Sequence, residues 1–265
     1  MDVQIMGILN VTPDSFSDGG RFLDVAAAVA HGLALAADGA AIIDVGGEST
    51  RPGAEAVSAD EELRRVVGVI EGLVAAGAGA AISIDTSKTE VARAALDAGA
   101  SFVNDVTALT ADGMAELVAA RGVECCLVHM QGEPRTMQRD PRYGDVVAEV
   151  REFLAARVEA VHAAGVARER ILVDPGIGFG KTVEHNLALL ERLDEIASLG
   201  QRVLIGTSRK SFLGRLARRD DDERLAGTIA TNVIALLRGA SVFRVHDVAP
   251  VADALAVAAA TVSRR

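Results

Sequence analysis

The chain has 265 residues, half of them hydrophobic, and a formal net charge of −10. A chain of this length can bury about three quarters of the surface that it exposes when unfolded, so its core can stabilise it without disulfides. The acidic balance disfavours a general nucleic-acid surface, and no apolar run reaches the roughly 18 residues that a membrane span requires. We therefore expect a globular protein that has no nucleic-acid or membrane partner.

The N-terminus and the cysteines indicate the compartment. The sequence MDVQIMGILN has no basic segment ahead of an apolar one, so we expect no signal peptide. The two cysteines, Cys125 and Cys126, are adjacent and poorly placed to bridge each other. Small core thiols of this kind are typical of a reducing compartment, which predicts a cytoplasmic protein.

Short apolar runs alternate with helical patterns along the whole chain. We expect strands over residues 3–9, 41–45, 81–84, 101–103, 124–128, 171–173, 202–205 and 242–245. Asp24 is placed to cap a helix that runs to about residue 38. Ser58 and Glu61 have the spacing of a capping box for a helix to about residue 76. Thr86 or Ser87 can cap the next helix, and a further one begins near Asp145.

Alternating strands and helices predict a parallel sheet. Eight repeats in this length indicate one α/β domain over residues 1–265, a closed (β/α)₈ barrel; an open, doubly wound sheet is the alternative. Nearly every strand ends in a polar residue, which favours the barrel because active sites of such barrels lie on that face. We expect long loops after the first, second and fifth strands, over residues 11–20, 46–57 and 130–143.

One group of polar side chains follows the first, seventh and eighth strands, which are neighbours in a closed barrel. Arg244 and His246 are one residue apart and share a face of the last strand, Lys210 follows the seventh, and Asn10 ends the first. This is the usual place for a phosphate site in such barrels, and Arg and Lys suit phosphate oxygens.

Both cationic residues of the last strand have simpler alternatives. Arg244 could instead form an ion pair with Asp247 or Asp18, and His246 could be a hydrogen-bonded histidine on the rim. A magnesium ion would suit an oxygen-rich site beside phosphate, held through Asn10 and water.

A second group, Asp85, Asn104 and Asp174, ends the third, fourth and sixth strands. Two carboxylates and an amide can bind the donor–acceptor edge of a flat heterocycle. Each acid alone could be a helix cap, but three such residues on one face predict a binding site. His129 is not part of such a group of polar residues, and we expect it to support the residues that contact the ligand rather than to contact the ligand itself.

The segment ILVDPGIGFGKT, residues 171–182, superficially resembles a nucleotide-binding Walker A loop. Its end, Gly180-Lys181-Thr182, fits GxxxxGK[ST], but the position of the first glycine is Pro175. We therefore reject a nucleotide loop. Phe16, an apolar residue in the first polar loop, suits a lid, although a side chain folded back onto the rim is an alternative.

The motifs resemble those of dihydropteroate synthases over almost the whole chain. They are GILNVTPDSFSDGG, DVGGESTRPGA, SIDTSK, NDV, HMQGEPRTMQ, DPGIGFGKT, GTSRKSFLG and RVHDV, in the order expected for that family. The resemblance implies a (β/α)₈ barrel, usually a homodimer. It also implies a transferase of folate biosynthesis, a target of sulfonamides, which joins 6-hydroxymethyl-7,8-dihydropterin diphosphate to p-aminobenzoate with magnesium.

The resemblance also implies a role for each matching residue. Those that would hold the pterin are Asp85, Asn104, Met130, Asp174, Phe179, Gly206 and Lys210. The diphosphate would contact Asn10, Thr50, Arg244 and His246, with Asn10 also a magnesium ligand and Asp18 supporting the ion. The p-aminobenzoate pocket would comprise Phe16, Thr50, Arg51, Pro52 and Ser211.

The family's chemistry implies a dissociative displacement, in which diphosphate leaves before the aromatic amine attacks. The residues expected to take part are Asp85, Asp174, Lys210, Arg244 and His246. Two other functions share the pterin pocket: a pterin-dependent methyltransferase domain, which has no use for the cationic group, and a non-catalytic pterin-binding paralogue.

Overall fold

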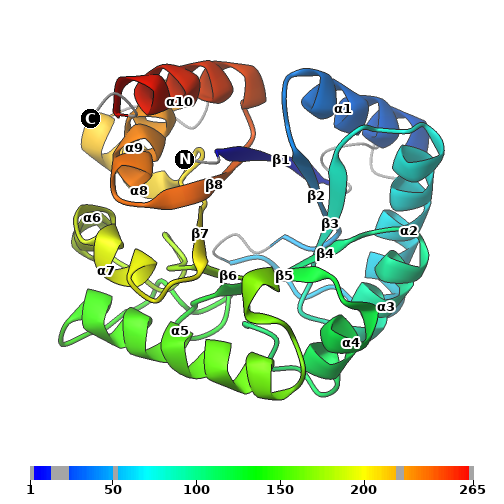
Figure 1. Ribbon diagram of the computed structural model, residues 1–265, viewed down its shortest axis with the longest axis horizontal. Helices are drawn as coiled ribbons and strands as arrows, with labels where there is room; N and C mark the ends of the chain where they lie inside the picture. The colour runs from blue at the N-terminus through cyan, green and yellow to red at the C-terminus, as the bar shows by residue number, and fades with distance from the viewer. Residues whose placement is uncertain (1–2, 13–23, 50–52, 219–223, 263–265) are drawn as a thin grey trace.

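The structure is a computed structural model, and it describes residues 3–12, 24–49, 53–218 and 224–262. Its parallel strands pair in chain order, and β1 pairs with both β2 and β8. The predicted closed barrel is therefore confirmed, and the open sheet is excluded (Figure 1). The strands are β1 (Gln4–Asn10), β2 (Ile42–Gly46), β3 (Ala81–Asp85), β4 (Phe102–Asp105), β5 (Glu124–Val128), β6 (Ile171–Asp174), β7 (Arg202–Ile205) and β8 (Ala240–Val245).

Helices surround the barrel (Figure 1). They are α1 (Val25–Ala37), α2 (Ala59–Ala75), α3 (Thr89–Asp97), α4 (Met114–Arg121), α5 (Val146–Ala163), α6 (Val183–Glu191), α7 (Leu193–Ala197), α8 (Ser211–Ala217), α9 (Leu225–Leu237) and α10 (Val248–Val262). A short 3₁₀ helix, η1 (Arg168–Arg170), precedes β6, and two helices follow each of β6 and β7.

Three of the predicted helix starts are confirmed. The Asp145 carboxylate accepts the Val147 N–H at 3.0 Å, which caps α5. The Asp24 carboxylate accepts the Ala27 N–H at 2.9 Å, which caps α1. The Ser58 hydroxyl accepts the Glu61 N–H at 3.3 Å, which caps α2. The Glu61 carboxylate accepts a hydrogen bond from Arg65 rather than from the Ser58 backbone, so half of the capping box forms.

The predicted cap of α3 is wrong. Its N-cap is Lys88, which makes no side-chain cap hydrogen bond, rather than Thr86 or Ser87. The Thr86 hydroxyl accepts the Lys88 N–H at 3.2 Å and so stabilises the turn before the helix. The helix therefore begins one residue later than a cap at Ser87, and two later than a cap at Thr86, would place it.

Two apolar layers hold the fold together. One lies between the strands and the helices; the other is a separate cluster that includes Met6, Phe102, Cys126, Leu204 and Val242 and fills the barrel interior. Because neighbouring residues of a strand face opposite sides, Cys125 belongs to the first layer and Cys126 to the second. Both are buried free thiols, and burial raises the pKa of Cys125 to about 12.

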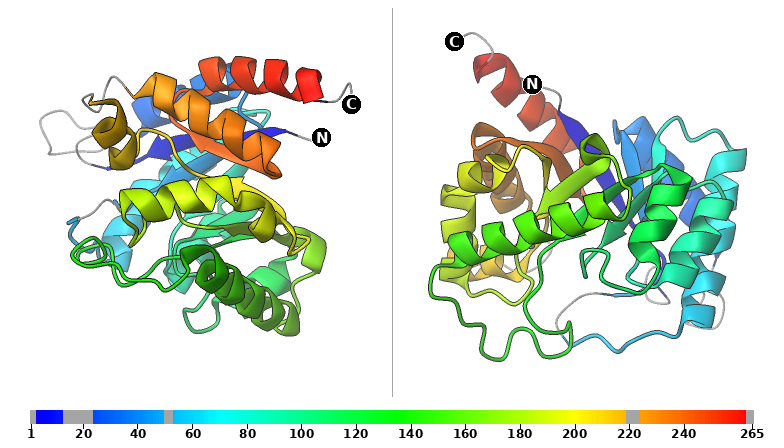
Figure 2. Two further views of the ribbon diagram at one scale, coloured as in Figure 1. Left: turned by 90° about the vertical axis from the view of Figure 1, so that its left-hand side faces the viewer. Right: turned by 60° about the horizontal axis from the view of Figure 1, so that its bottom comes forward.

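The two ends of the barrel differ. The start of β1 and the end of α10 lie at one end, and the 130–143 segment lies at the opposite end (Figure 2). We call the end at which the strands begin the floor, and the end at which they finish the mouth. At the floor, Arg202 on β7 pairs with Glu124 on β5 and donates to Gln4 on β1 at 3.2 Å.

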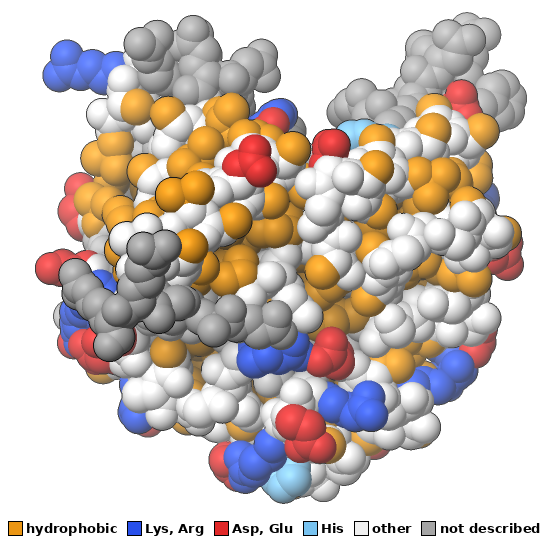
Figure 3. Space-filling view, turned by 45° about the horizontal axis from the view of Figure 1, so that its top comes forward, with side chains coloured by type: hydrophobic (Ala, Val, Ile, Leu, Met, Phe, Trp, Pro, Cys, Tyr) orange, Lys and Arg blue, Asp and Glu red, His pale blue; other side chains and the backbone are white. Residues whose placement is uncertain are grey.

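The surface carries charges of both signs. On the face in Figure 3, hydrophobic side chains spread over the upper part, whereas basic and acidic side chains are interspersed along the lower part. Within the described ranges, no helix is both long and apolar enough to cross a membrane.

Candidate active site

The strand register aligns three of the predicted site residues, Asn10, Asp85 and Asn104, in one row at the mouth. Asn10 is level with Gly46, Gly46 with Asp85, and Asp85 with Asn104. A Cβ atom at Gly46 would lie 3.7 Å from Asp85 Oδ2 and 3.9 Å from Asn10 Oδ1. The glycine therefore leaves space beside an amide oxygen and a carboxylate, which come from β1 and β3.

Arg244 joins the cationic and acidic groups that the sequence predicted separately. Its Nε donates to Asp44 Oδ2 and its Nη2 donates to Asp85 Oδ2, each at 2.6 Å. The predicted alternative with Asp247 is wrong, because Asp247 pairs with Arg209 instead; the alternative with Asp18 lies outside the described residues. Burial alone would lower the pKa of Arg244, but the carboxylates of Asp44 and Asp85 hold it above its ordinary value.

Asp44 is the site residue that sequence reasoning did not single out. It is fully buried on β2, and its Oδ2 also accepts a hydrogen bond from Asn104 Nδ2 at 3.0 Å. Within the described ranges, Asp44 Oδ1 and Asn104 Oδ1 are buried oxygens that have no hydrogen-bond partner. Such atoms are costly unless a ligand or water satisfies them. The available signal was a carboxylate two residues before the end of an otherwise apolar strand.

Of the remaining acids of the mouth, Asp174 is buried and Asp85 is partly buried. Burial raises the pKa of Asp85 to about 7, although the Arg244 guanidinium opposes this shift. Burial also raises the pKa of Asp174, against the hydrogen bond that Gly176 N–H donates to Asp174 Oδ1 at 2.7 Å. Burial therefore favours the protonated form of both acids, and N–H donors or positive charge on a bound molecule would favour the ionised form.

The glycine loop after β6 is shaped by close backbone contacts. Gly176 has a φ of 68°, and a Cβ there would lie 1.8 Å from the His129 carbonyl oxygen. A residue with a side chain would therefore displace the loop that carries Asp174. Asn186, at the start of α6, accepts the Gly178 N–H at 2.8 Å and holds the middle of the loop.

Lys210 and Phe179 form one wall of the site. The Lys210 ammonium lies 4.0 Å from the centroid of the Phe179 ring, a cation–π contact. Phe179 and Met130 pack against the apolar cluster of the barrel interior. At Gly206 a Cβ would lie 3.9 Å from both Asp174 Oδ2 and Arg244 Cβ, so a larger residue would enter the space between these two groups.

His129 and Lys181 form a buried pair behind this wall, as expected for His129. Lys181 Nζ lies 3.0 Å from His129 Nδ1 and donates to the carbonyls of Phe179 at 3.0 Å and His129 at 3.3 Å. Burial lowers the pKa of Lys181 to about 7, and burial together with Lys181 lowers the pKa of His129 to about 3. Lys181 therefore links the loops after β5 and β6, a role that the rejected Walker A comparison did not suggest.

His246 lies beside the loop after β7. Its Nδ1 is 3.0 Å from Ser208 Oγ, which also accepts the His246 backbone N–H at 3.1 Å. Ser211 is exposed at the first position of α8. The other predicted residues, Phe16, Thr50, Arg51 and Pro52, lie outside the described residues.

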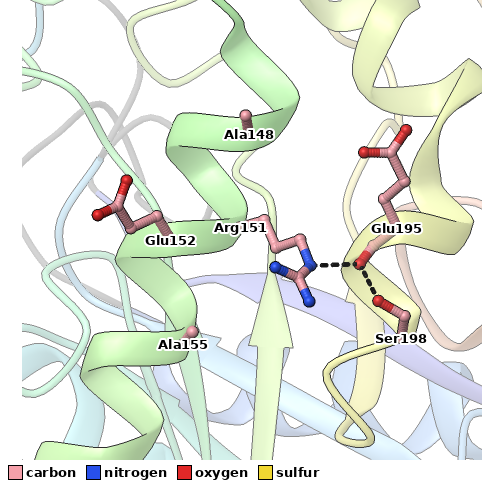
Figure 4. Close-up of a pocket in the computed structure, with 6 residues that line it drawn as sticks. All are labelled: Ala148, Arg151, Glu152, Ala155, Glu195 and Ser198. Atoms are coloured by element: carbon pink, nitrogen blue, oxygen red, sulfur yellow. Dashed lines mark hydrogen bonds between the residues drawn. The ribbon is translucent and has the colours of Figure 1, made fainter.

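A surface groove of about 590 Å³ lies away from the mouth, between α5 and α7. Figure 4 shows Arg151 crossing it to donate to the Glu195 carbonyl at 3.2 Å, which also accepts from the Ser198 hydroxyl at 2.7 Å. None of the predicted site residues lines this groove, so we place the candidate site at the mouth.

Comparison with known proteins agrees with the geometry. The family model described as pterin binding enzyme matches residues 6–246. The chain is 48% identical over 261 residues to the dihydropteroate synthase of Escherichia coli K12, covering 98% of this chain and 92% of that protein.

Two solved structures of similar proteins extend the match to the fold. The dihydropteroate synthase of Xanthomonas albilineans with 4-aminobenzoic acid is 51% identical with a TM-score of 0.92, over 98% of this chain and 93% of that one. The Yersinia pestis enzyme in a sulfonamide complex is 44% identical with a TM-score of 0.93, over 99% and 95%. The chain therefore belongs to the pterin-binding enzymes, in the dihydropteroate synthase family.

Proposed function

We propose that the mouth of this barrel carries out the dihydropteroate synthase reaction, with the pterin among the buried acids and the diphosphate beside Arg244. In that reaction 6-hydroxymethyl-7,8-dihydropterin diphosphate and p-aminobenzoate give 7,8-dihydropteroate and diphosphate. The observation that carries this proposal is the Arg244–Asp85 hydrogen bond at 2.6 Å. This hydrogen bond holds a cation suited to phosphate next to the acids suited to a pterin. A substrate that carries a pterin and a diphosphate on one carbon requires the two subsites to be adjacent.

The pterin pocket uses Asp85, Asn104 and Asp174 as its polar side. An ionised carboxylate accepts two donors, so Asp174 and Asp85 can bind N–H groups of the ring. Asn104 Oδ1, which has no partner among the described residues, offers a further buried acceptor. Lys210 closes the pocket above the Phe179 ring. Met130 adds to the apolar side of the pocket, and Gly206, which has no side chain, leaves room for the ring.

The diphosphate lies toward β8 and β1, against Arg244, His246 and Asn10. Arg244 supplies a planar fork for phosphate oxygens. It is already held in the mouth by Asp44 and Asp85 before any ligand binds. Thr50 is assigned to the same subsite by its place in the family's second loop.

The reaction breaks the bond between the pterin methylene carbon and the diphosphate oxygen, and the electron pair leaves with diphosphate. Arg244 and His246 stabilise the charge that develops on the leaving group. The carbon cation that remains is delocalised into the ring, where Asp85 and Asp174 favour it electrostatically. The amine of p-aminobenzoate then forms the new C–N bond and releases a proton to solvent, so no side chain acts as nucleophile.

The residues present fit a magnesium ion that arrives with the diphosphate. Within the described ranges no three His, Cys, Asp or Glu side chains converge as a metal site. Magnesium ordinarily keeps several waters and binds through one or two protein oxygens and substrate phosphates. Asn10 would hold it, and the ion would neutralise charge on the diphosphate.

The p-aminobenzoate subsite lies outside the pterin pocket, near α8. We assign it to Phe16, Thr50, Arg51, Pro52 and Ser211 by their motifs. A relative binds 4-aminobenzoic acid and another binds a sulfonamide drug, which supports competition between these two classes of molecule for this subsite.

The assembly is a homodimer in a reducing cytoplasm. Large hydrophobic side chains are exposed on the adjacent helices α8, α9 and α10, namely Leu216 (53%), Ile234 (44%), Leu237 (54%) and Val257 (70%). Exposed apolar side chains on neighbouring helices suit a contact between subunits. The buried free thiols of Cys125 and Cys126 suit the compartment.

The test is a product assay with purified protein, both substrates and magnesium. Dihydropteroate should form together with one equivalent of diphosphate, and both should require p-aminobenzoate. A protein that binds pterin diphosphate without forming dihydropteroate would instead be a non-catalytic pterin-binding paralogue. Transfer of a methyl group would indicate the pterin-dependent methyltransferase alternative.

A further inference from the structure

Two hydrogen bonds join the same two residues at the ends of β7 and β8. Ser208 Oγ accepts the His246 backbone N–H at 3.1 Å and lies 3.0 Å from the Nδ1 atom of the His246 ring. Ser208 is buried, with 6% of its surface exposed. The serine hydroxyl therefore contacts both the backbone and the imidazole of one residue that we assign to the diphosphate.

The protons of this pair can be placed by counting donors and acceptors. A serine hydroxyl has one proton and two lone pairs, and one lone pair is occupied by the His246 backbone N–H. If Nδ1 carried a proton, the oxygen would accept twice and its own proton would need another acceptor. In the part of the chain that the structure describes, Nδ1 is the one candidate acceptor within hydrogen-bond distance of this hydroxyl. The arrangement that satisfies the hydroxyl and the backbone N–H together is a hydroxyl that donates to a bare Nδ1.

We propose that Ser208 is a positioning residue that fixes the neutral His246 ring as the tautomer with its proton on Nε2. In this tautomer the second ring nitrogen is a donor, which suits a phosphate oxygen; the other tautomer would offer a lone pair to an anion. This proposal rests on the proposed function in one respect, the assignment of His246 to the diphosphate.

Ser208 is held in place by contacts that do not depend on a substrate. The preceding residue, Thr207, is fully buried and accepts a hydrogen bond from the Thr231 hydroxyl at 2.8 Å. The following residue, Arg209, donates its backbone N–H to the Thr228 hydroxyl at 3.1 Å. Both partners lie on α9, so this helix fixes the loop that presents Ser208 to His246.

A second pair reinforces the first. Arg209 pairs with Asp247 through Nε at 3.0 Å and Nη2 at 2.6 Å. Consecutive residues of the loop after β7 thus bind consecutive residues after β8. This double contact limits movement of the imidazole relative to the hydroxyl, which a fixed tautomer requires.

The test is a long-range ¹H–¹⁵N spectrum of protein labelled with ¹⁵N-histidine at pH 8.5, where protonated and bare ring nitrogens have distinct shifts. His246 is assigned as the signal absent from a His246→Gln variant. The wild type should show a bare Nδ1 and a protonated Nε2, and Ser208→Ala should show a mixture of tautomers. Ser208→Thr, which keeps the hydroxyl, should restore the wild-type pattern, and Ser198→Ala, at the C-cap of α7, is the control that should leave it unchanged.

Binding gives a second readout that does not need turnover. The Kd for inorganic diphosphate should rise about tenfold in Ser208→Ala, the size expected for one misplaced hydrogen bond to a charged group, and should recover in Ser208→Thr. A proton on Nδ1 in the wild type, or a Ser208→Ala protein with unchanged spectrum and affinity, would overturn the proposal. A wild type that has the expected tautomer but forms no dihydropteroate would contradict the proposed function instead.

Discussion

An arginine spans each end of the barrel, but the two arginines are held differently. At the floor, the side chains of Arg202 and Glu124 are 33% and 37% exposed. At the mouth, Arg244 is 21% exposed and its partners Asp44 and Asp85 are 0% and 15% exposed. The floor pair is solvated, whereas the arginine of the mouth is paired with a fully buried carboxylate, whose second oxygen has no hydrogen-bond partner among the described residues. The comparison indicates that similar residues stabilise one end and prepare the other for a ligand.

The largest expected effect comes from removing the arginine of the mouth. Arg244→Met should lower kcat/KM about a thousandfold, because it removes the donors expected to stabilise the leaving diphosphate. Steady-state kinetics with both substrates would measure it. Activity within a fewfold of wild type would show that Arg244 is a structural residue like Arg202.

The buried acids should make pterin binding depend on pH. Because the pKa of Asp85 is about 7 in the empty site, the carboxylate is increasingly protonated below that pH and loses its capacity to accept N–H donors. The Kd for the pterin diphosphate should therefore rise as pH falls from 7 to 5.5, by up to about tenfold per pH unit. Calorimetric titration would measure this, and a slope retained in Asp85→Asn would assign it to another group.

Lys181 should give the protein a distinct alkaline stability profile. Its pKa is about 7 when folded, whereas an unfolded lysine titrates near 10.5. Between these values the unfolded chain binds one more proton, so the free energy of unfolding should rise with pH by up to about 1.4 kcal/mol per unit. Urea unfolding of the wild type and of Lys181→Met should differ by this slope between pH 7 and 9. Parallel profiles would mean that Lys181 stays charged in the folded protein.

The smallest effect is expected at the floor. Arg202→Met should change the free energy of unfolding by at most about 1 kcal/mol, because the pair with Glu124 is exposed. Its kcat/KM should remain within about twofold of wild type. Thermal unfolding and the product assay check both values, and a large loss of activity would remove the proposed difference between the two ends.

The fold could be predicted because nearly every strand repeats one local pattern, an apolar run that ends in a polar residue. Strand order then placed Asp85, Asn104 and Asp174 at one end without knowledge of any contact. The ion pairs could not be predicted in the same way. Arg244 and Asp44 are 200 residues apart, and only the barrel's closure brings them together.

The sequence pattern did not identify three buried residues of the site, Asp44, Lys181 and Ser208. Asp44 lies inside a strand rather than at its end. The search for polar residues at strand ends, which identified Asp85 and Asp174, therefore did not include it. Ser208 was one of several polar residues in TSRKSFLG, and its contact with His246 depends on the arrangement of two neighbouring loops. Lys181 is 3% exposed because the glycine loop folds over it, which residue type alone does not indicate.

The most direct test is whether the mouth holds two subsites that can be lost separately. Calorimetric titrations of 6-hydroxymethylpterin and of inorganic diphosphate would be carried out on the wild type, Asp174→Asn and Arg244→Met. Asp174→Asn should lose pterin binding and keep diphosphate binding, and Arg244→Met should do the reverse. If both variants bound both molecules like the wild type, the buried charges of the mouth would not be the binding site.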